Sequence, residues 1–155
     1  MAPCFLGCTM VFNDLLARIV QRKPLPKKVT MHDAYISKVC MAMGGKIVYD
    51  STVHMMYRQH DRNVIGGTIG MKNALERRFN IAFCKKKVGT DRDAKEILRL
   101  YNMEISSNKR TWISQIAHYN DNVGNRIRIA MSLKFKSISL NMAISIRIAL
   151  LLGNF

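Results

Sequence analysis

The sequence is short of acidic residues. Its 155 residues include 10 Asp plus Glu against 25 Lys plus Arg, which gives a formal net charge of +15. The excess is spread along the chain, because residues 1–77 carry 11 basic and 5 acidic groups and residues 78–155 carry 14 and 5. No folded core requires such a surplus, so it must be solvated or neutralised by a partner. Nucleic acid is the commonest such partner, and an anionic membrane surface is the second.

Sequence motifs for catalysis and metal binding are missing as well. The chain has no G-x-S-x-G, no P-loop and no H-E-x-x-H, and its GGTIG cluster is better interpreted as a loop than as a nucleotide fingerprint. The four cysteines form no C-x-x-C pair and have no histidines at zinc-ligand spacing. His54, His60 and His118 are expected at the surface or an interface. We therefore expect no enzyme, no metal and no cofactor, and reduced thiols in an intracellular protein.

Long apolar runs are also lacking. A helix that spans a membrane needs about 18–20 apolar residues, whereas the most apolar window, Ile138–Leu152, is shorter and contains Arg147. The N-terminal stretch MAPCFLGCTMVF has no basic region before it and is interrupted by Gly7 and Thr9. We therefore expect neither a membrane anchor nor a signal peptide.

What the C-terminal part does contain is a regular alternation. Apolar residues first occupy every second position in one phase, at Ile127, Ile129, Met131, Leu133 and Phe135. The phase then shifts by one residue, to Ile138, Leu140, Met142, Ile144, Ile146, Ile148 and Leu150. A period of two is typical of a half-buried strand, and a one-residue shift requires a bend or reversal. The pattern predicts two strands, at about 126–135 and 142–151, with a turn near residues 136–141.

The rest of the chain predicts further short elements. Residues 13–21 begin with cap-type side chains and favour a short amphipathic helix, and the two prolines of residues 21–28 favour an extended basic linker. Strands are expected within 28–50, around a turn at Gly44 and Gly45, and over 52–58 and 79–83. Helical segments are expected over 74–78 and 93–100, with Asp93 as a cap. Many short strands and brief helices predict an all-β jelly-roll type antiparallel sandwich or barrel over residues 29–155, preceded by a helix and basic linker over residues 1–28.

Basic residues next to aromatic ones form the candidate nucleic-acid-binding sites. Lysine and arginine neutralise phosphates, and exposed rings stack on unpaired bases. The clusters are Arg77 and Arg78 beside Phe79; Lys85, Lys86 and Lys87 after Phe83; and Lys109, Arg110 and Trp112. Arg18, Arg22, Lys23, Lys27 and Lys28 add a basic N-terminal segment, which is either a linker or a signal for a nuclear import receptor. The alternative is that the aromatic rings are core residues and the charges are merely solvated.

Three segments of the chain, taken in order, resemble the coat proteins of geminiviruses. They are KNALERRFNIAFCKKK (72–87), NKRTWISQIAHYNDNVGNRIRIAMSLKF (108–135) and MAISIRIALLL (142–152). Upstream, STVHMMYRQHDRNVIGGT is similar to the family's strand that ends in an Asp-Arg loop, here Asp61 and Arg62. The resemblance covers residues 27–152 and concerns order and pattern more than identity.

The resemblance implies a capsid protein with an eight-stranded jelly roll. Such a protein assembles with copies of itself into a virion shell around circular single-stranded DNA and carries that DNA to the host nucleus. The family's long basic arm is reduced here to the five N-terminal cations, and its cysteine-rich segment is missing. A nuclear shuttle or movement protein that forms no capsid is therefore a variant of this hypothesis. The competing hypothesis is a non-enzymatic RNA-binding component of a ribosome-like particle.

Overall fold

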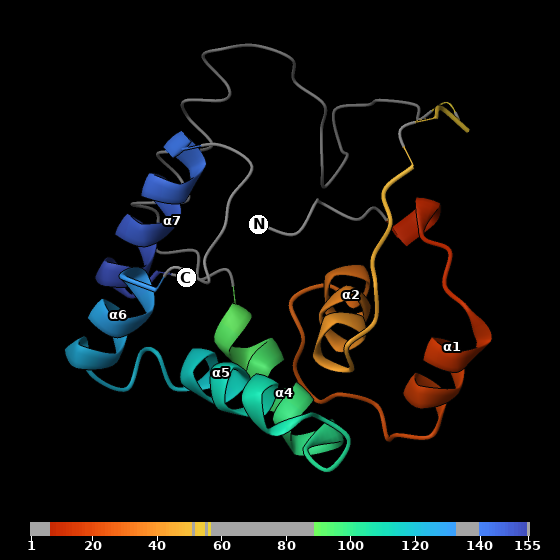
Figure 1. The fold of residues 1–155 in the computed structure, drawn as a ribbon, viewed down its shortest axis with the longest axis horizontal. Coiled ribbons are helices and arrows are strands. Elements are labelled where there is room, and N and C mark those ends of the chain that lie inside the picture. The colour runs from red at the N-terminus through yellow and green to blue at the C-terminus, as the bar shows by residue number, and fades with distance from the viewer. Residues whose placement is uncertain (1–6, 51, 55, 57–88, 133–139, 155) are drawn as a thin grey trace.

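The fold is known from a computed structural model that describes residues 7–50, 52–54, 56, 89–132 and 140–154. Within these ranges the elements are η1 (Gly7–Thr9), α1 (Asp14–Gln21), α2 (His32–Ala42), α4 (Thr90–Tyr101), α5 (Ser107–Ala117), α6 (Val123–Ala130) and α7 (Leu140–Leu152) (Figure 1). All regular elements of the described residues are helices, and none is a strand. The predicted all-β jelly roll is therefore wrong.

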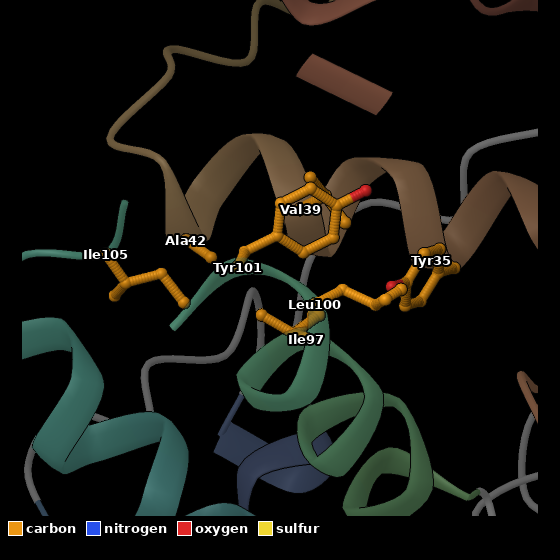
Figure 2. Close-up of a cluster of buried hydrophobic side chains, with 7 residues drawn as sticks. All are labelled: Tyr35, Val39, Ala42, Ile97, Leu100, Tyr101 and Ile105. Carbon is orange, nitrogen blue, oxygen red and sulfur yellow. The ribbon is translucent and has the colours of Figure 1, made fainter. Parts of the chain in front are cut away.

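The first of two buried clusters lies between α2 and α4. Seven side chains form it: Tyr35, Val39, Ala42, Ile97, Leu100, Tyr101 and Ile105. Figure 2 shows them meeting between the α2 ribbon and the α4 ribbon. Residues 93, 94, 97, 100 and 101 of α4 are buried, which is the spacing of one helix face. From α1, Leu16, Ile19 and Val20 pack against the same cluster. The N-terminal helix therefore belongs to this core.

The second cluster joins α5 to the C-terminal helices. Its buried members are Tyr119, Ile129, Ala130, Ile146 and Leu150, and Trp112 of α5 packs against them. In Figure 1, α6 and α7 lie side by side, and α5 continues from them toward α4. Since α4 packs against α5 and α5 against α6, the helix α5 connects the two clusters.

The two predicted C-terminal strands are wrong over the residues that the structure describes, because α6 covers 126–130 and α7 covers 142–151. In a strand, residues 127, 129 and 131 would share one face. In the helix, Ile129 is 1 % exposed, whereas Ile127 and Met131 are 48 % and 71 % exposed. A turn of α-helix takes 3.6 residues, so positions 127 and 131 lie together on the face opposite Ile129. The expected turn near residues 136–141 falls largely outside the described residues.

The alternation wrongly indicated strands because a run that is apolar at every second position is also apolar at every fourth, which is the spacing of one helix face. In α7, Ile146 and Leu150 are separated by four residues and are both buried, as is Ala149 between them. Ile144, which the alternation places on the same strand face, is 48 % exposed. At 13 residues α7 is longer than a typical strand, and length separates the two periods better than alternation does.

The shorter predictions had mixed outcomes. The helix over residues 13–21 is confirmed: α1 begins at Asp14, and the side chain of its N-cap Asn13 accepts a hydrogen bond from the Leu16 N–H at 3.0 Å. The strands expected within residues 28–50 are wrong: α2 forms over 32–42, and residues 43–50 form no strand. The helix over 93–100 is confirmed but extends over Thr90–Tyr101. The elements predicted over 74–78 and 79–83, and most of 52–58, lie outside the described residues.

Asp93 is not the predicted cap of α4, because the N-cap residue is Gly89 with a φ of 72°. Its carboxylate is fully buried and accepts hydrogen bonds from the N–H and the hydroxyl of Thr30 at 2.9 and 3.3 Å. The Lys38 ammonium of α2 forms an ion pair with the same carboxylate. Asp93 thereby ties α4 both to α2 and to the chain that precedes α2.

The C-terminal helix α7 is predominantly apolar in sequence but short. At 13 residues it extends roughly 20 Å, against a hydrocarbon core of about 30 Å. None of the helices in the described part of the chain is long and apolar enough to cross a membrane.

Candidate nucleic-acid interface

One face of α4 and one face of α5 meet at an open cleft, which we call the basic cleft. Lys95, Leu98 and Arg99 of α4, with Asn102 after it, form one wall, and Arg110 and Ser114 of α5, with His118 after it, form the other. Each set recurs every three or four residues, so each lies on one face of its helix. The volume of the cleft is about 450 Å³.

A smaller hollow, which we call the side pocket, adjoins the basic cleft at Ser114 and His118. Its other lining residues are Gln115 of α5 and Asn125, Arg128 and Ile129 of α6, and its volume is about 170 Å³. Together the two hollows carry four Lys or Arg side chains: Lys95, Arg99, Arg110 and Arg128. No acidic residue is among the described residues that line them. The whole site therefore carries a positive field suited to anions.

The four cations differ in how far carboxylates neutralise them. Arg99 is held by Glu96, with 2.7 Å between guanidinium nitrogen and carboxylate oxygen, and Lys95 lies 4.0 Å from the Asp91 carboxylate. Arg110 donates to the backbone carbonyl of Ile105 at 3.0 Å. Neither Arg110 nor Arg128 forms an ion pair with a described carboxylate. These two arginines therefore supply most of the unbalanced charge of the site.

At the end of α5, His118 lies where the basic cleft meets the side pocket. Its Nδ1 lies 2.8 Å from a carboxylate oxygen of Asp121, and Asn125 donates from its side chain to the His118 carbonyl oxygen at 2.9 Å. Asn125 in turn belongs to the first turn of α6, which Asn122 caps by accepting the Asn125 N–H. This network fixes the chain between α5 and α6 and holds His118 in place beside the cations.

Of the predicted cluster on α5, the structure places only Arg110 in the site. Lys109 donates to the backbone carbonyl of Met41 at 2.8 Å, on the side of α2. Trp112 packs against the second buried cluster, as the alternative interpretation expected. Among the described lining residues there is no Phe, Trp or Tyr.

Two of the predicted N-terminal cations, Lys23 and Lys27, lie along α4, and neither lines the site. Lys23 forms an ion pair with Glu104 and lies 5.8 Å from the centre of the Tyr101 ring. The Lys27 N–H donates to the Glu96 carboxylate at 3.0 Å. Because Lys23 meets the end of α4 and Lys27 meets its middle, the basic linker runs antiparallel to the helix.

The remaining N-terminal cations are exposed. Arg18 pairs with Asp14 one turn earlier in α1, at 2.6 Å. Arg22 and Lys28 form no ion pair with any residue that the structure describes, and both are exposed. They stay candidates for a second contact with an anionic partner. The other candidates, Arg77, Arg78, Lys85, Lys86 and Lys87, lie outside the described residues and stay predictions.

Two carboxyl groups near the linker titrate at lower pH than usual. The hydrogen bond from Arg99 lowers the pKa of the Glu96 carboxyl. The hydrogen bond from Lys23 lowers the pKa of the Glu104 carboxyl in the same way. Both groups are therefore charged in the folded protein at neutral pH, and each neutralises a cation.

Sequence reasoning missed Lys95, Arg99, His118 and Arg128. One signal was available, since after Glu104 the chain has a single acidic residue, Asp121, against seven basic ones: Lys109, Arg110, Arg126, Arg128, Lys134, Lys136 and Arg147. The second signal, a spacing of three or four residues on a helix, was available for Lys95 and Arg99, since a helix was expected over 93–100, but not for Arg128, where a strand was expected. The position of basic residues next to aromatic ones was a less useful criterion for finding the site.

The described residues include no group of three His, Cys, Asp or Glu side chains placed to hold a metal ion. Comparison of the chain with models of known protein families, with curated proteins and with solved structures found no match.

Proposed function

We propose that the protein is a non-enzymatic nucleic-acid-binding protein that holds the phosphates of a single strand in the basic cleft. The observation that carries the proposal is the convergence of Lys95, Arg99 and Arg110, with Arg128 adjoining, at a site that no described acidic residue lines. Phosphates held by such cations release counterions, and this release drives binding. The net charge of +15 adds a long-range attraction of the same sign.

The kind of nucleic acid follows from the sequence hypotheses. The resemblance to geminivirus coat proteins supports single-stranded DNA, and with it a location in the virion and the host nucleus. The shell does not enter the proposal, because it depended on a jelly roll that the described helices replace. The second candidate is RNA in a ribosome-like particle, which the helical fold and the charge accommodate equally well.

The proposal predicts that neutralising the site weakens binding in a salt-dependent way. We suggest the double variant Lys95→Gln/Arg128→Gln, since both side chains are exposed and neither makes a close ion pair with a described residue. Removing two phosphate contacts is expected to reduce the slope of log affinity against log salt by about two units. Fluorescence anisotropy with labelled single-stranded DNA, single-stranded RNA and an RNA hairpin measures this slope and ranks the candidate ligands.

Two matched variants control for net charge. Lys46→Gln/Arg92→Gln removes the same charge from exposed positions outside the site, and Arg22→Gln/Lys28→Gln removes it from the linker. The first control should leave the slope nearly unchanged, whereas the linker variant reports whether Arg22 and Lys28 form a second contact. Equal losses from the site variant and the first control would overturn the proposal, as would the absence of salt-dependent binding to any of the nucleic acids.

A further inference from the structure

The side pocket has hydrogen-bonding groups that no other described residue uses. Within the described part of the chain, the Gln115 amide and the Ser114 hydroxyl take part in no hydrogen bond. The Asn125 amide nitrogen donates to the His118 carbonyl oxygen, and its Oδ1 accepts from no described residue. Two amides and one hydroxyl therefore offer both donors and acceptors to a ligand in a hollow of about 170 Å³.

The remaining lining groups are flat or apolar. His118 and Arg128 carry planar side chains, and both are exposed at the rim of the side pocket. Ile129 is 1 % exposed and belongs to the second buried cluster, so it forms a fixed apolar floor. Imidazole and guanidinium planes are surfaces on which unpaired bases stack.

We propose that the side pocket accepts one unpaired nucleobase of the strand whose phosphates occupy the basic cleft. The inference rests on the proposed function and adds what that function lacks, which is a site for a base. Amides that offer donors and acceptors match the polar edge of a base. The stacking planes and the Ile129 floor match its faces, and Ser114 and His118 connect the side pocket to the phosphate path.

A phosphate group or a base within a duplex fits the side pocket less well than an unpaired base does. A phosphate group would meet a single cation there, Arg128, while the amides and the Ile129 floor would go unused. The basic cleft, with Lys95, Arg99 and Arg110, serves a phosphate better. A duplex keeps its bases stacked and paired, so it cannot place one in a hollow of this size without unstacking. The pocket therefore selects single strands over duplexes.

The test compares ligands that carry equal charge with and without bases. We suggest short labelled oligonucleotides of T, C or A, an abasic oligonucleotide of the same length, a duplex, and inorganic polyphosphate as competitor. The wild-type protein is expected to bind the best base-containing strand roughly tenfold more tightly than the abasic strand, which is within the range for one well-recognised base. Equal binding of the abasic strand, or equal binding of the duplex, would contradict the base pocket.

The variant Gln115→Ala tests the contribution of the side pocket to binding without changing the charge of the site. It should lower affinity for the preferred strand severalfold, leave the abasic strand unaffected and keep the salt slope unchanged. Asn102→Ala is the matched control, because Asn102 is an amide that lines the basic cleft but not the side pocket. Alanine favours helices, and circular dichroism verifies that both variants fold.

The outcomes separate the two proposals. If the base-containing strand, the abasic strand and polyphosphate all bind alike with a steep salt dependence, the base pocket is wrong and the basic cleft stands. Equal losses from Gln115→Ala and Asn102→Ala would also overturn the base pocket. If none of these ligands binds, the proposed function itself fails.

Discussion

The cations on the two sides of α4 differ in how far carboxylates pair with them. On the linker side, Glu104 pairs with Lys23 and Asp93 pairs with Lys38, while Glu96 accepts the Lys27 backbone N–H and also holds Arg99 of the basic cleft. On the side where α5 and α6 lie, Arg110 and Arg128 meet no described carboxylate. Of the ten acidic residues in the chain, only Asp121 follows Glu104.

The difference separates charges that serve folding from charges that are available to a partner. Around the linker, pairing with acidic groups stabilises the arrangement of α1, α2 and α4. Around the basic cleft and the side pocket, Arg110 and Arg128 have no described carboxylate as partner, so their repulsion of neighbouring cations costs stability unless an anion binds. The following predictions test whether the two sides are distinct in this sense.

The largest expected effect is that of Asp93→Ala on the linker side. The substitution leaves the Lys38 ammonium partly buried without its partner and removes the acceptor of the Thr30 N–H. Removing one member of a buried pair is strongly destabilising, and because Lys38 keeps some solvent access we expect a loss of about 3 kcal/mol in the free energy of unfolding. Urea denaturation followed by circular dichroism measures it.

Asp14→Asn is the control for this prediction. It removes a carboxylate that forms an exposed ion pair with Arg18 within α1. Exposed pairs contribute about 0–1 kcal/mol, so the change should be small. Similar effects from the two substitutions would show that the buried contacts of Asp93 do not anchor the linker side.

The next effect concerns the end of α7, where Gly153 has a φ of 73°. A Cβ added there would lie 2.8 Å from the Asn120 Oδ1 and 2.9 Å from the Arg126 Cζ. Left-handed backbone costs a residue other than glycine about 1–2 kcal/mol, and the close contacts add to this. Gly153→Ala should therefore lower the free energy of unfolding by about 2 kcal/mol, measured by urea denaturation.

Gly124→Ala, in the neighbouring helix α6, is expected to change the free energy of unfolding in the opposite direction. Gly124 lies inside α6 with an ordinary helical backbone, and its added Cβ would approach only the Asn122 Oδ1, at 3.3 Å. Alanine is the better helix former, so stability should stay the same or rise slightly. A loss as large as that of Gly153→Ala would mean that α6 and α7 do not pack as described.

The sequence was sufficient for elements whose signals are local. Helix α1 could be predicted because Asn13 is a good cap and the apolar residues after it share one helical face. Helix α4 could be predicted in position but not in its start, since Asp93 resembles a cap and is instead a buried acceptor for Thr30. Whether an Asp caps a helix or binds a distant residue depends on tertiary contacts.

The sequence was not sufficient where one pattern fits two periods. Apolar residues at 146 and 150 satisfy both a strand and a helix, and the isoleucines of α6 and α7 favour strands by propensity. Packing of Ile129, Ile146 and Leu150 in one cluster overrides that preference. The basic cleft could not be predicted from the sequence for a related reason. Its walls come from two helices, α4 and α5, whose proximity is a property of the fold.

The smallest effect is a difference in acid sensitivity between the two sides of the molecule. Hydrogen bonds from Arg99 and Lys23 lower the pKa values of Glu96 and Glu104 in the folded state. A carboxyl whose pKa is lowered by folding stabilises the protein above its unfolded pKa. That contribution is lost as the pH falls through the lower, folded value. Stability should therefore fall in acid, below the ordinary carboxyl value of 4.5.

Hydrogen exchange compares the two sides directly. Amides of α4 should lose more protection than those of α6 and α7 when the pH is lowered from 6 toward about 3, after correction for the intrinsic exchange rate, because α6 and α7 contain no acidic residue. The double variant Glu96→Gln/Glu104→Gln should remove most of this difference while keeping acceptors for the Lys27 N–H and for Lys23. If α6 and α7 lose protection equally in the wild-type protein, the carboxylates stabilise the whole chain as one unit, and the distinction between a paired side and an open side is wrong.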